Sequence, residues 1–167
     1  MYHTNTMGET IIKLIHDKFD NDFGFMSGTE DCNLDEIVEE LSKLECTHVP
    51  NRIYTWGNKV DTAIPMDFDL AFDVSLFFTK IKDMKSIRTL TGNDQEIQDS
   101  IMRHPRFISL AENILTTINK EKPHEIGFIC NFGKHRSVGW ANIMKKHFYQ
   151  RSIIYNYTLK NHSPQNA

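Results

Sequence analysis

The feature that most constrains the fold is a short apolar segment, Ile126 to Cys130, that leads into a glycine-containing loop and a helical pattern from Ser137. A short apolar run bounded by turn residues is typical of a buried strand. A strand that passes through a tight loop into a helix is the building block of parallel α/β sheets. Since other apolar segments alternate with helical patterns along the chain, we expect an α/β fold with a largely parallel sheet flanked by helices.

The other elements are predicted from apolar periodicity and capping residues. In chain order they are a helix over residues 11–19, a helix over 33–44, a strand within 68–78, helices before and after His104-Pro105, and a strand over 152–159. Residues 50–65 are expected to be irregular. Asp73 is placed at the carboxyl end of its strand, because a carboxylate inside a buried strand is costly. We predict an acidic helical extension over 1–50, an α/β domain over 51–160 and a flexible tail over 161–167.

Charge is distributed unevenly along the chain. Residues 1–50 contain 11 acidic and 3 basic side chains, whereas residues 126–167 contain 6 Lys or Arg and no Asp or Glu. A solvated helix face explains part of this bias. An acid-free stretch of this length also points to an anionic partner, such as a phosphate, a nucleotide or RNA.

Composition argues against several classes of protein. No apolar run reaches the roughly 18 residues of a membrane span, and the segment from Met1 to Gly8 lacks the pattern of a secretory signal. The cysteines, Cys32, Cys46 and Cys130, lack the spacing of a disulfide framework or a zinc site. We therefore expect a cytoplasmic protein with no metal, no cofactor and no membrane partner.

The loop after the apolar strand carries the strongest chemical signal. It reads Cys130-Asn131-Phe132-Gly133-Lys134-His135-Arg136-Ser137. Free N–H groups at a helix start, together with the helix dipole, attract anions. Gly133 lets the backbone turn closely around an anion, Arg136 can hold two phosphate oxygens, and Lys134 and His135 add positive charge. Because ligands of parallel sheets bind at the carboxyl ends of strands, this loop predicts a site for a phosphorylated ligand.

The C-x-x-G-x-x-R-S spacing of the loop also resembles the phosphate loop of cysteine-dependent tyrosine phosphatases. In that family the cysteine is a thiolate nucleophile and the arginine binds the phosphoryl group. A helix N-terminus and nearby cations favour thiolate chemistry, so Cys130 is a candidate nucleophile. Asp73, Asp94 and His135 are candidates for the acid that protonates the leaving group. A cysteine that only fills space is the alternative reading of Cys130.

Three segments together resemble a larger known domain. They are Phe68-Asp69-Leu70-Ala71-Phe72-Asp73-Val74, then Leu90-Thr91-Gly92-Asn93-Asp94, then the segment from Gly127 to Val138. These are similar to the ADLVFDVR, LTGLD and IGCTGGQHRSV motifs of the C-terminal domain of RapZ, a bacterial RNase adapter family. The order and approximate spacing agree over residues 53–160.

The resemblance implies a domain that senses glucosamine-6-phosphate, contributes to small-RNA binding and works as a homo-oligomer. The resemblance also implies which residues form the ligand site, because they match the family motifs. They are Asp73, Thr91, Gly92, Cys130, Gly133, His135, Arg136 and Ser137. Cys130 is then first a residue that lines the ligand. This chain has Ser75 where the family motif ends in Arg, and Phe132-Gly133 where the family has Gly-Gly. The G-x-x-x-x-G-K-[ST] motif of a nucleotide-binding P-loop does not occur in the sequence.

RNA binding is the remaining hypothesis. Basic residues alternate with aromatic ones in the last third of the chain, namely Lys145, Lys146, Phe148, Tyr149, Arg151, Tyr155, Tyr157 and Lys160. Proteins recognise single-stranded RNA by stacking its bases on aromatic side chains, although packing inside a helix and a strand explains the same aromatics. The sequence therefore favours a binding module for a sugar phosphate or a nucleotide, with a cysteine-dependent phosphatase and an RNA-binding regulator as alternatives.

Overall fold

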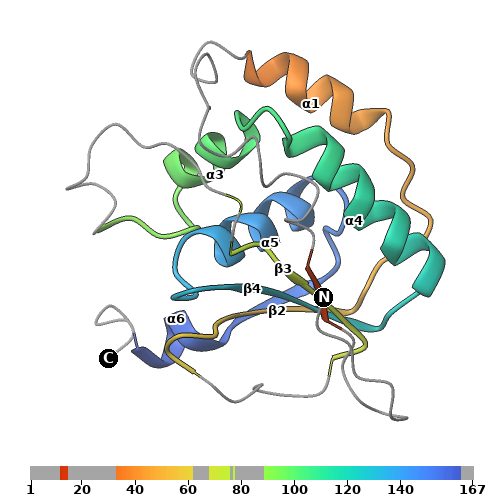
Figure 1. Cartoon of the computed structure of the whole chain (residues 1–167). Coiled ribbons are helices and arrows are strands. Elements are labelled where there is room, and N and C mark those ends of the chain that lie inside the picture. The colour runs from red at the N-terminus through yellow and green to blue at the C-terminus, as the bar shows by residue number, and fades with distance from the viewer. Residues whose placement is uncertain (1–11, 15–32, 62–67, 76, 78–88, 163–167) are drawn as a thin grey trace.

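The computed structural model describes residues 12–14, 33–61, 68–75, 77 and 89–162 (Figure 1). Its strands are β1 (Ile12–Leu14), β2 (Arg52–Gly57), β3 (Leu70–Asp73), β4 (Glu125–Cys130) and β5 (Ile153–Asn156). Its helices are α1 (Leu34–Ser42), α3 (Gln95–Met102), α4 (Phe107–Glu121), α5 (Arg136–His147) and α6 (Tyr157–His162). Within these residues, no helix combines the length and apolar composition that crossing a bilayer requires.

The strands form a single sheet in the order β1-β3-β4-β2-β5. Every neighbouring pair in this sheet is parallel. The α/β class and the parallel sheet predicted from the sequence are therefore confirmed. The predicted helix cap at Asn33 is also present, because the Asn33 side chain accepts the N–H of Asp35 at 2.9 Å at the start of α1.

Helices α1, α3, α4 and α5 cover one side of the sheet (Figure 1). The main core lies between these helices and the sheet, where Phe72, Phe128 and Trp140 are fully buried. A smaller cluster covers the other side of the sheet, where Trp56 and Phe68 stack with their ring centroids 4.9 Å apart. The continuous apolar composition of β3 and β4 follows from this burial on both faces.

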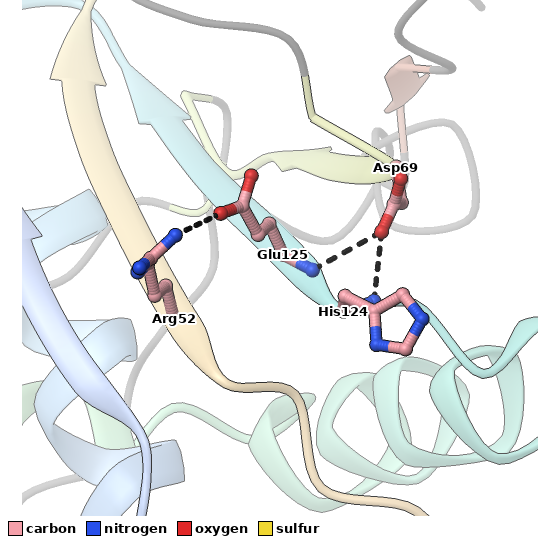
Figure 2. Close-up of polar contacts among 4 residues, drawn as sticks. All are labelled: Arg52, Asp69, His124 and Glu125. Carbon is pink, nitrogen blue, oxygen red and sulfur yellow. Dashed lines mark hydrogen bonds and ion pairs between the residues drawn. The ribbon is translucent and has the colours of Figure 1, made fainter. Parts of the chain in front are cut away.

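The amino ends of the strands are joined by polar contacts (Figure 2). Asp69, just before β3, accepts the backbone N–H groups of His124 and Glu125 at 2.7 and 3.2 Å. Arg52, the first residue of β2, forms an ion pair of 2.7 Å with Glu125, the first residue of β4. These contacts align the starts of three neighbouring strands, so that their carboxyl ends also meet at one edge.

Three local predictions need correction. Residues 12–14, which were expected within a helix over 11–19, form β1, because pairing with β3 satisfies their backbone groups; the rest of that segment lies outside the described residues. Residues 52–57, expected to be irregular, form β2, which pairs with β4 and β5. The final strand ends at Asn156, where α6 begins and continues to His162. The remainder of the predicted tail lies outside the described residues.

Candidate functional site

The loop between β4 and α5 curves around the side chain of Cys130. The N–H of Gly133 donates to Cys130 Sγ at 3.2 Å, and Sγ lies 3.1 Å from Ser137 Oγ. Gly133 has a φ of +65°, in the left-handed region that favours glycine. Cys130 is 2% exposed and Ser137 is fully buried. The predicted tight turn is therefore present, and the thiol lies inside it.

Arg136 follows this loop directly and is the first residue of α5. Burial lowers the pKa of Arg136, while the nearby Cys130 and Asp73 act on it in the opposite direction. Asp73 is the last residue of β3, as predicted, and is 5% exposed. Asp73 Oδ1 accepts the N–H of Ser75 at 2.8 Å. A guanidinium, a thiol and a carboxylate from three separate segments therefore interact at this edge of the sheet.

The turn formed by Thr91 and Gly92 packs directly on the same loop. The N–H of Gly92 donates to the carbonyl of Lys134 at 2.8 Å, and a ring nitrogen of His135 lies 2.8 Å from the carbonyl of Leu90. A Cβ atom on Gly92 would lie 2.1 Å from the backbone nitrogen of Gly139 in α5. Glycine is thus required here by close approach of two backbones.

Two amide side chains that the sequence interpretation missed hold this turn in place. Gln98 and Asn142 donate to the carbonyl of Gly92 at 2.9 and 3.2 Å. Asn142 also donates to Asn93 Oδ1 at 2.9 Å, and so links α5 to the turn. Gln98 is buried within α3, and a polar residue on the buried face of a predicted helix is a signal that would have identified it.

The end of β2 forms another wall that the sequence interpretation missed. A Cβ atom on Gly57 would lie 2.2 Å from the carbonyl carbon of Phe132. The N–H groups of Asn58 and Lys59 donate to the carbonyls of Cys130 and Asn131 at 3.0 and 2.9 Å. This wall was not predicted because β2 itself was not recognised as a strand.

Thr158, at the start of α6, ties the same wall to the last helix. Its hydroxyl oxygen accepts the N–H of Gly57 at 2.8 Å, and the hydroxyl donates to Asp61 at 2.7 Å. The buried hydroxyl therefore joins the ends of β2 and β5. No motif in the sequence indicates this contact, because the two residues lie far apart along the chain.

The remaining predicted residues occupy distinct positions around the loop. Lys134 and Asn131 are half-buried, and Phe132 is 60% exposed. Asp94, a candidate acid, instead accepts the N–H of Thr91 at 2.7 Å and stabilises the turn. Positive charge within the loop therefore comes from Lys134 and Arg136.

The basic and aromatic residues of the last third do not form one surface. Tyr149 is fully buried, and Lys145 donates to the carbonyl of Ser152 at 2.5 Å. Lys145 and Lys146 lie in the last turn of α5, where cations stabilise the helix dipole. This turn is roughly 15 Å from the loop end of the helix, at 1.5 Å per residue. The positive charge of Lys145 and Lys146 therefore stabilises the carboxyl end of α5 and does not contribute to the loop.

Comparison with known proteins places this arrangement in a family. A family model described as the RapZ C-terminal domain matches residues 52–163. The chain belongs to the RapZ C-terminal domain family. The match extends from β2 to α6 and contains the whole loop, whereas β1 and α1 lie outside it.

Curated relatives are longer proteins. A nucleotide-binding protein of Polynucleobacter asymbioticus is 34% identical over 127 residues, which cover 70% of this chain and 42% of the relative. A nucleotide-binding protein of Sorangium cellulosum is 30% identical over 119 residues, covering 65% of this chain and 33% of the relative. One of Desulfitobacterium hafniense is 34% identical over 129 residues, covering 71% and 42%. The chain spans less than half the length of these relatives.

Proposed function

We propose that the chain is a binding module for a phosphorylated small molecule, held by the loop from Cys130 to Ser137. The observation that carries this proposal is the position of Arg136, which starts α5 beside a loop turned by Gly133 at a φ of +65°. Backbone N–H groups of such a loop and of the first helical turn can surround a phosphate. The guanidinium then adds a paired contact to two phosphate oxygens.

Two classes of phosphorylated ligand are supported by different arguments. The resemblance of the site to the RapZ family favours a sugar phosphate. The printed name of the curated relatives, nucleotide-binding protein, favours a nucleotide. Since the chain spans less than half of those relatives, the ligand of this part has to be measured directly.

Arg136→Ala is the variant that tests the proposal. Calorimetric titration with inorganic phosphate, hexose 6-phosphates and nucleoside monophosphates should identify a ligand for the full chain. We expect Arg136→Ala to weaken its binding about 100-fold, because a charge-assisted paired contact is lost. Arg151→Ala is the matched control, since Arg151 is exposed in the same acid-free stretch, and it should change affinity less than about twofold. Equal effects of the two substitutions would contradict the proposal.

A cysteine-dependent phosphatase is the second candidate, favoured by the contacts of Cys130 with Gly133 and Ser137. In this reaction the thiolate attacks phosphorus and expels the alcohol, and water then cleaves the cysteinyl phosphate. Asp73 would protonate the leaving oxygen. Hydrolysis of an aryl phosphate between pH 5 and 8 that disappears in Cys130→Ser would support this reaction. Absence of turnover across that range would exclude it.

RNA binding remains a third candidate because Tyr155 and Tyr157 are 41% and 37% exposed. Arg151 and Lys160 are exposed nearby in the sequence. RNA affinity that falls steeply with salt is expected if these cations neutralise phosphates. Affinity that is insensitive to salt would argue against this surface.

A further inference from the structure

The exposure of Phe132 distinguishes it from the other described phenylalanines. Phe132 is 60% exposed, whereas Phe148 is half-buried and the others, namely Phe68, Phe72, Phe77, Phe107 and Phe128, are at most 2% exposed. Burying such a ring against another apolar surface is favourable, so a group that covers it gains binding free energy. Because Phe132 lies inside the candidate phosphate loop, a bound ligand is a natural candidate for that covering group.

The backbone that carries Phe132 is held firmly. Its carbonyl carbon lies so close to Gly57 that no side chain fits at position 57, and the following Gly133 is equally confined against Gly57. The preceding carbonyls of Cys130 and Asn131 accept N–H groups from the loop after β2. A side chain on such a backbone presents its ring with little additional loss of conformational entropy on binding.

Position and chemistry together define what this ring can bind. Phe132 is adjacent to Gly133, whose N–H contacts Cys130 Sγ inside the loop. Phe132 belongs to the loop that would hold the phosphate, so the remainder of such a ligand can lie beside its ring. Aromatic side chains bind other planar rings by offset stacking, and each nucleobase has a flat face on which a phenylalanine ring can stack. The family motif has glycine at this position, so the ring is a property of this chain.

We propose that Phe132 is a specificity-determining residue, and that its ring stacks on the base of a nucleoside monophosphate whose phosphate occupies the adjacent loop. This inference rests on the proposed phosphate-binding function and adds the class of ligand. A nucleoside monophosphate is therefore preferred over a phosphorylated sugar that lacks a base.

Calorimetric titration of the full chain with adenosine 5′-monophosphate, ribose 5-phosphate and inorganic phosphate tests the inference. The first two ligands differ at the C1 position of the ribose, which carries the base in the nucleotide and a hydroxyl group in ribose 5-phosphate. We expect the nucleotide to bind about tenfold more tightly than ribose 5-phosphate, which is the effect of one stacked ring. Phe132→Leu should remove this preference and leave the affinity for ribose 5-phosphate within about twofold, whereas Phe132→Trp should retain the preference.

Tyr157→Leu is the control, because Tyr157 is another exposed aromatic outside the loop, and it should leave both affinities unchanged. Equal affinities of the wild-type chain for the nucleotide and ribose 5-phosphate would overturn the inference while the phosphate-binding proposal stands. An equal loss of both affinities in Phe132→Leu would show that Phe132 only shapes the loop, and would also overturn it. If none of the three ligands binds the wild-type chain, the inference fails; the phosphate-binding proposal fails with it only when hexose 6-phosphates do not bind either.

Discussion

The two edges of the parallel sheet are built by different means. At the amino edge, side chains make the links, through Asp69 and the ion pair of Arg52 with Glu125 (Figure 2). At the carboxyl edge, backbones approach one another at glycines, and Gly92 and Gly57 leave no room for a side chain. Links made by exposed side chains tolerate substitution, whereas direct backbone contacts do not.

This difference is consistent with the ligand site that we propose at the carboxyl edge. Backbone contacts fix the end of β2 and the loop around Cys130, and they fix the turn at Thr91 together with the carboxylate of Asp94. Arg136 is placed beside this frame as the first residue of α5. A rigid frame of this kind lowers the entropic cost of binding. If the two edges differ in this way, substitutions at the glycines of the carboxyl edge should cost more stability than substitutions of the side chains at the amino edge.

Gly92→Ala should have the largest effect. The new Cβ would lie 2.1 Å from the backbone nitrogen of Gly139, so either the turn or α5 has to move. We expect a loss of about 2 to 4 kcal/mol in the free energy of unfolding, measured with urea, and a loss of ligand binding.

Gly139→Ala is the matched control for Gly92→Ala. Its Cβ would meet the flexible end of the Ile101 side chain at 2.4 Å, which can shift. The expected cost is about 1 kcal/mol. If both substitutions cost the same, the argument that backbone contact makes this edge intolerant is wrong.

His104 lies between α3 and α4, away from both edges of the sheet, and makes the stability of the protein depend on pH. Burial, and to a lesser extent Arg106, lowers the pKa of His104 to about 4 from its ordinary value near 6.5. Between these values the unfolded chain binds a proton that the folded chain does not, so stability falls as pH decreases from about 6.5 to 4. A shift of this size implies a loss of about 2 to 3 kcal/mol.

Unfolding of wild type and His104→Phe at several pH values checks this expectation. The substituted ring can still stack on Phe77, which lies 4.0 Å from the His104 ring between centroids, but it cannot titrate. The variant should therefore lose less stability in acid than the wild type. Parallel pH profiles for the two proteins would show that His104 is not the source of the dependence.

Asp69→Ala should have a smaller effect, confined to the amino edge. Two backbone N–H groups lose their acceptor, but water can replace it because Asp69 is exposed. We expect a loss of about 1 kcal/mol in urea unfolding and an unchanged affinity for the ligand. Weakened ligand binding in this variant would mean that the two edges are coupled.

Glu125→Gln should have the smallest effect of the series. The ion pair with Arg52 lies on the surface, where solvent screens it. The melting temperature should be nearly the same as that of the wild type at physiological salt, with unchanged ligand affinity. A marked drop in melting temperature would show that the amino edge depends on this ion pair more than surface pairs usually allow.

Local sequence patterns were sufficient to predict those helices and strands whose capping residues, turn residues and apolar spacing lie within a few residues of one another. The capped helix α1, the helices on either side of His104-Pro105, and the strand, glycine turn and helix around Cys130 were all predicted. The position of Asp73 at the end of its strand was also predicted, because burial in a strand interior is too costly for a carboxylate.

Only the tertiary structure decided the contacts that join distant segments. Residues 12–14 and 52–57 became strands because pairing with β3, β4 and β5 satisfies their backbone groups, and no local pattern reports such partners. For the same reason, the glycine contacts of Gly57 and Gly92 and the links through Thr158 and Asn142 were not foreseen. The sequence by itself predicted the loop and, through the family resemblance, the turn at Thr91 beside it, whereas the parallel sheet decided that the end of β2 and Thr158 also lie there.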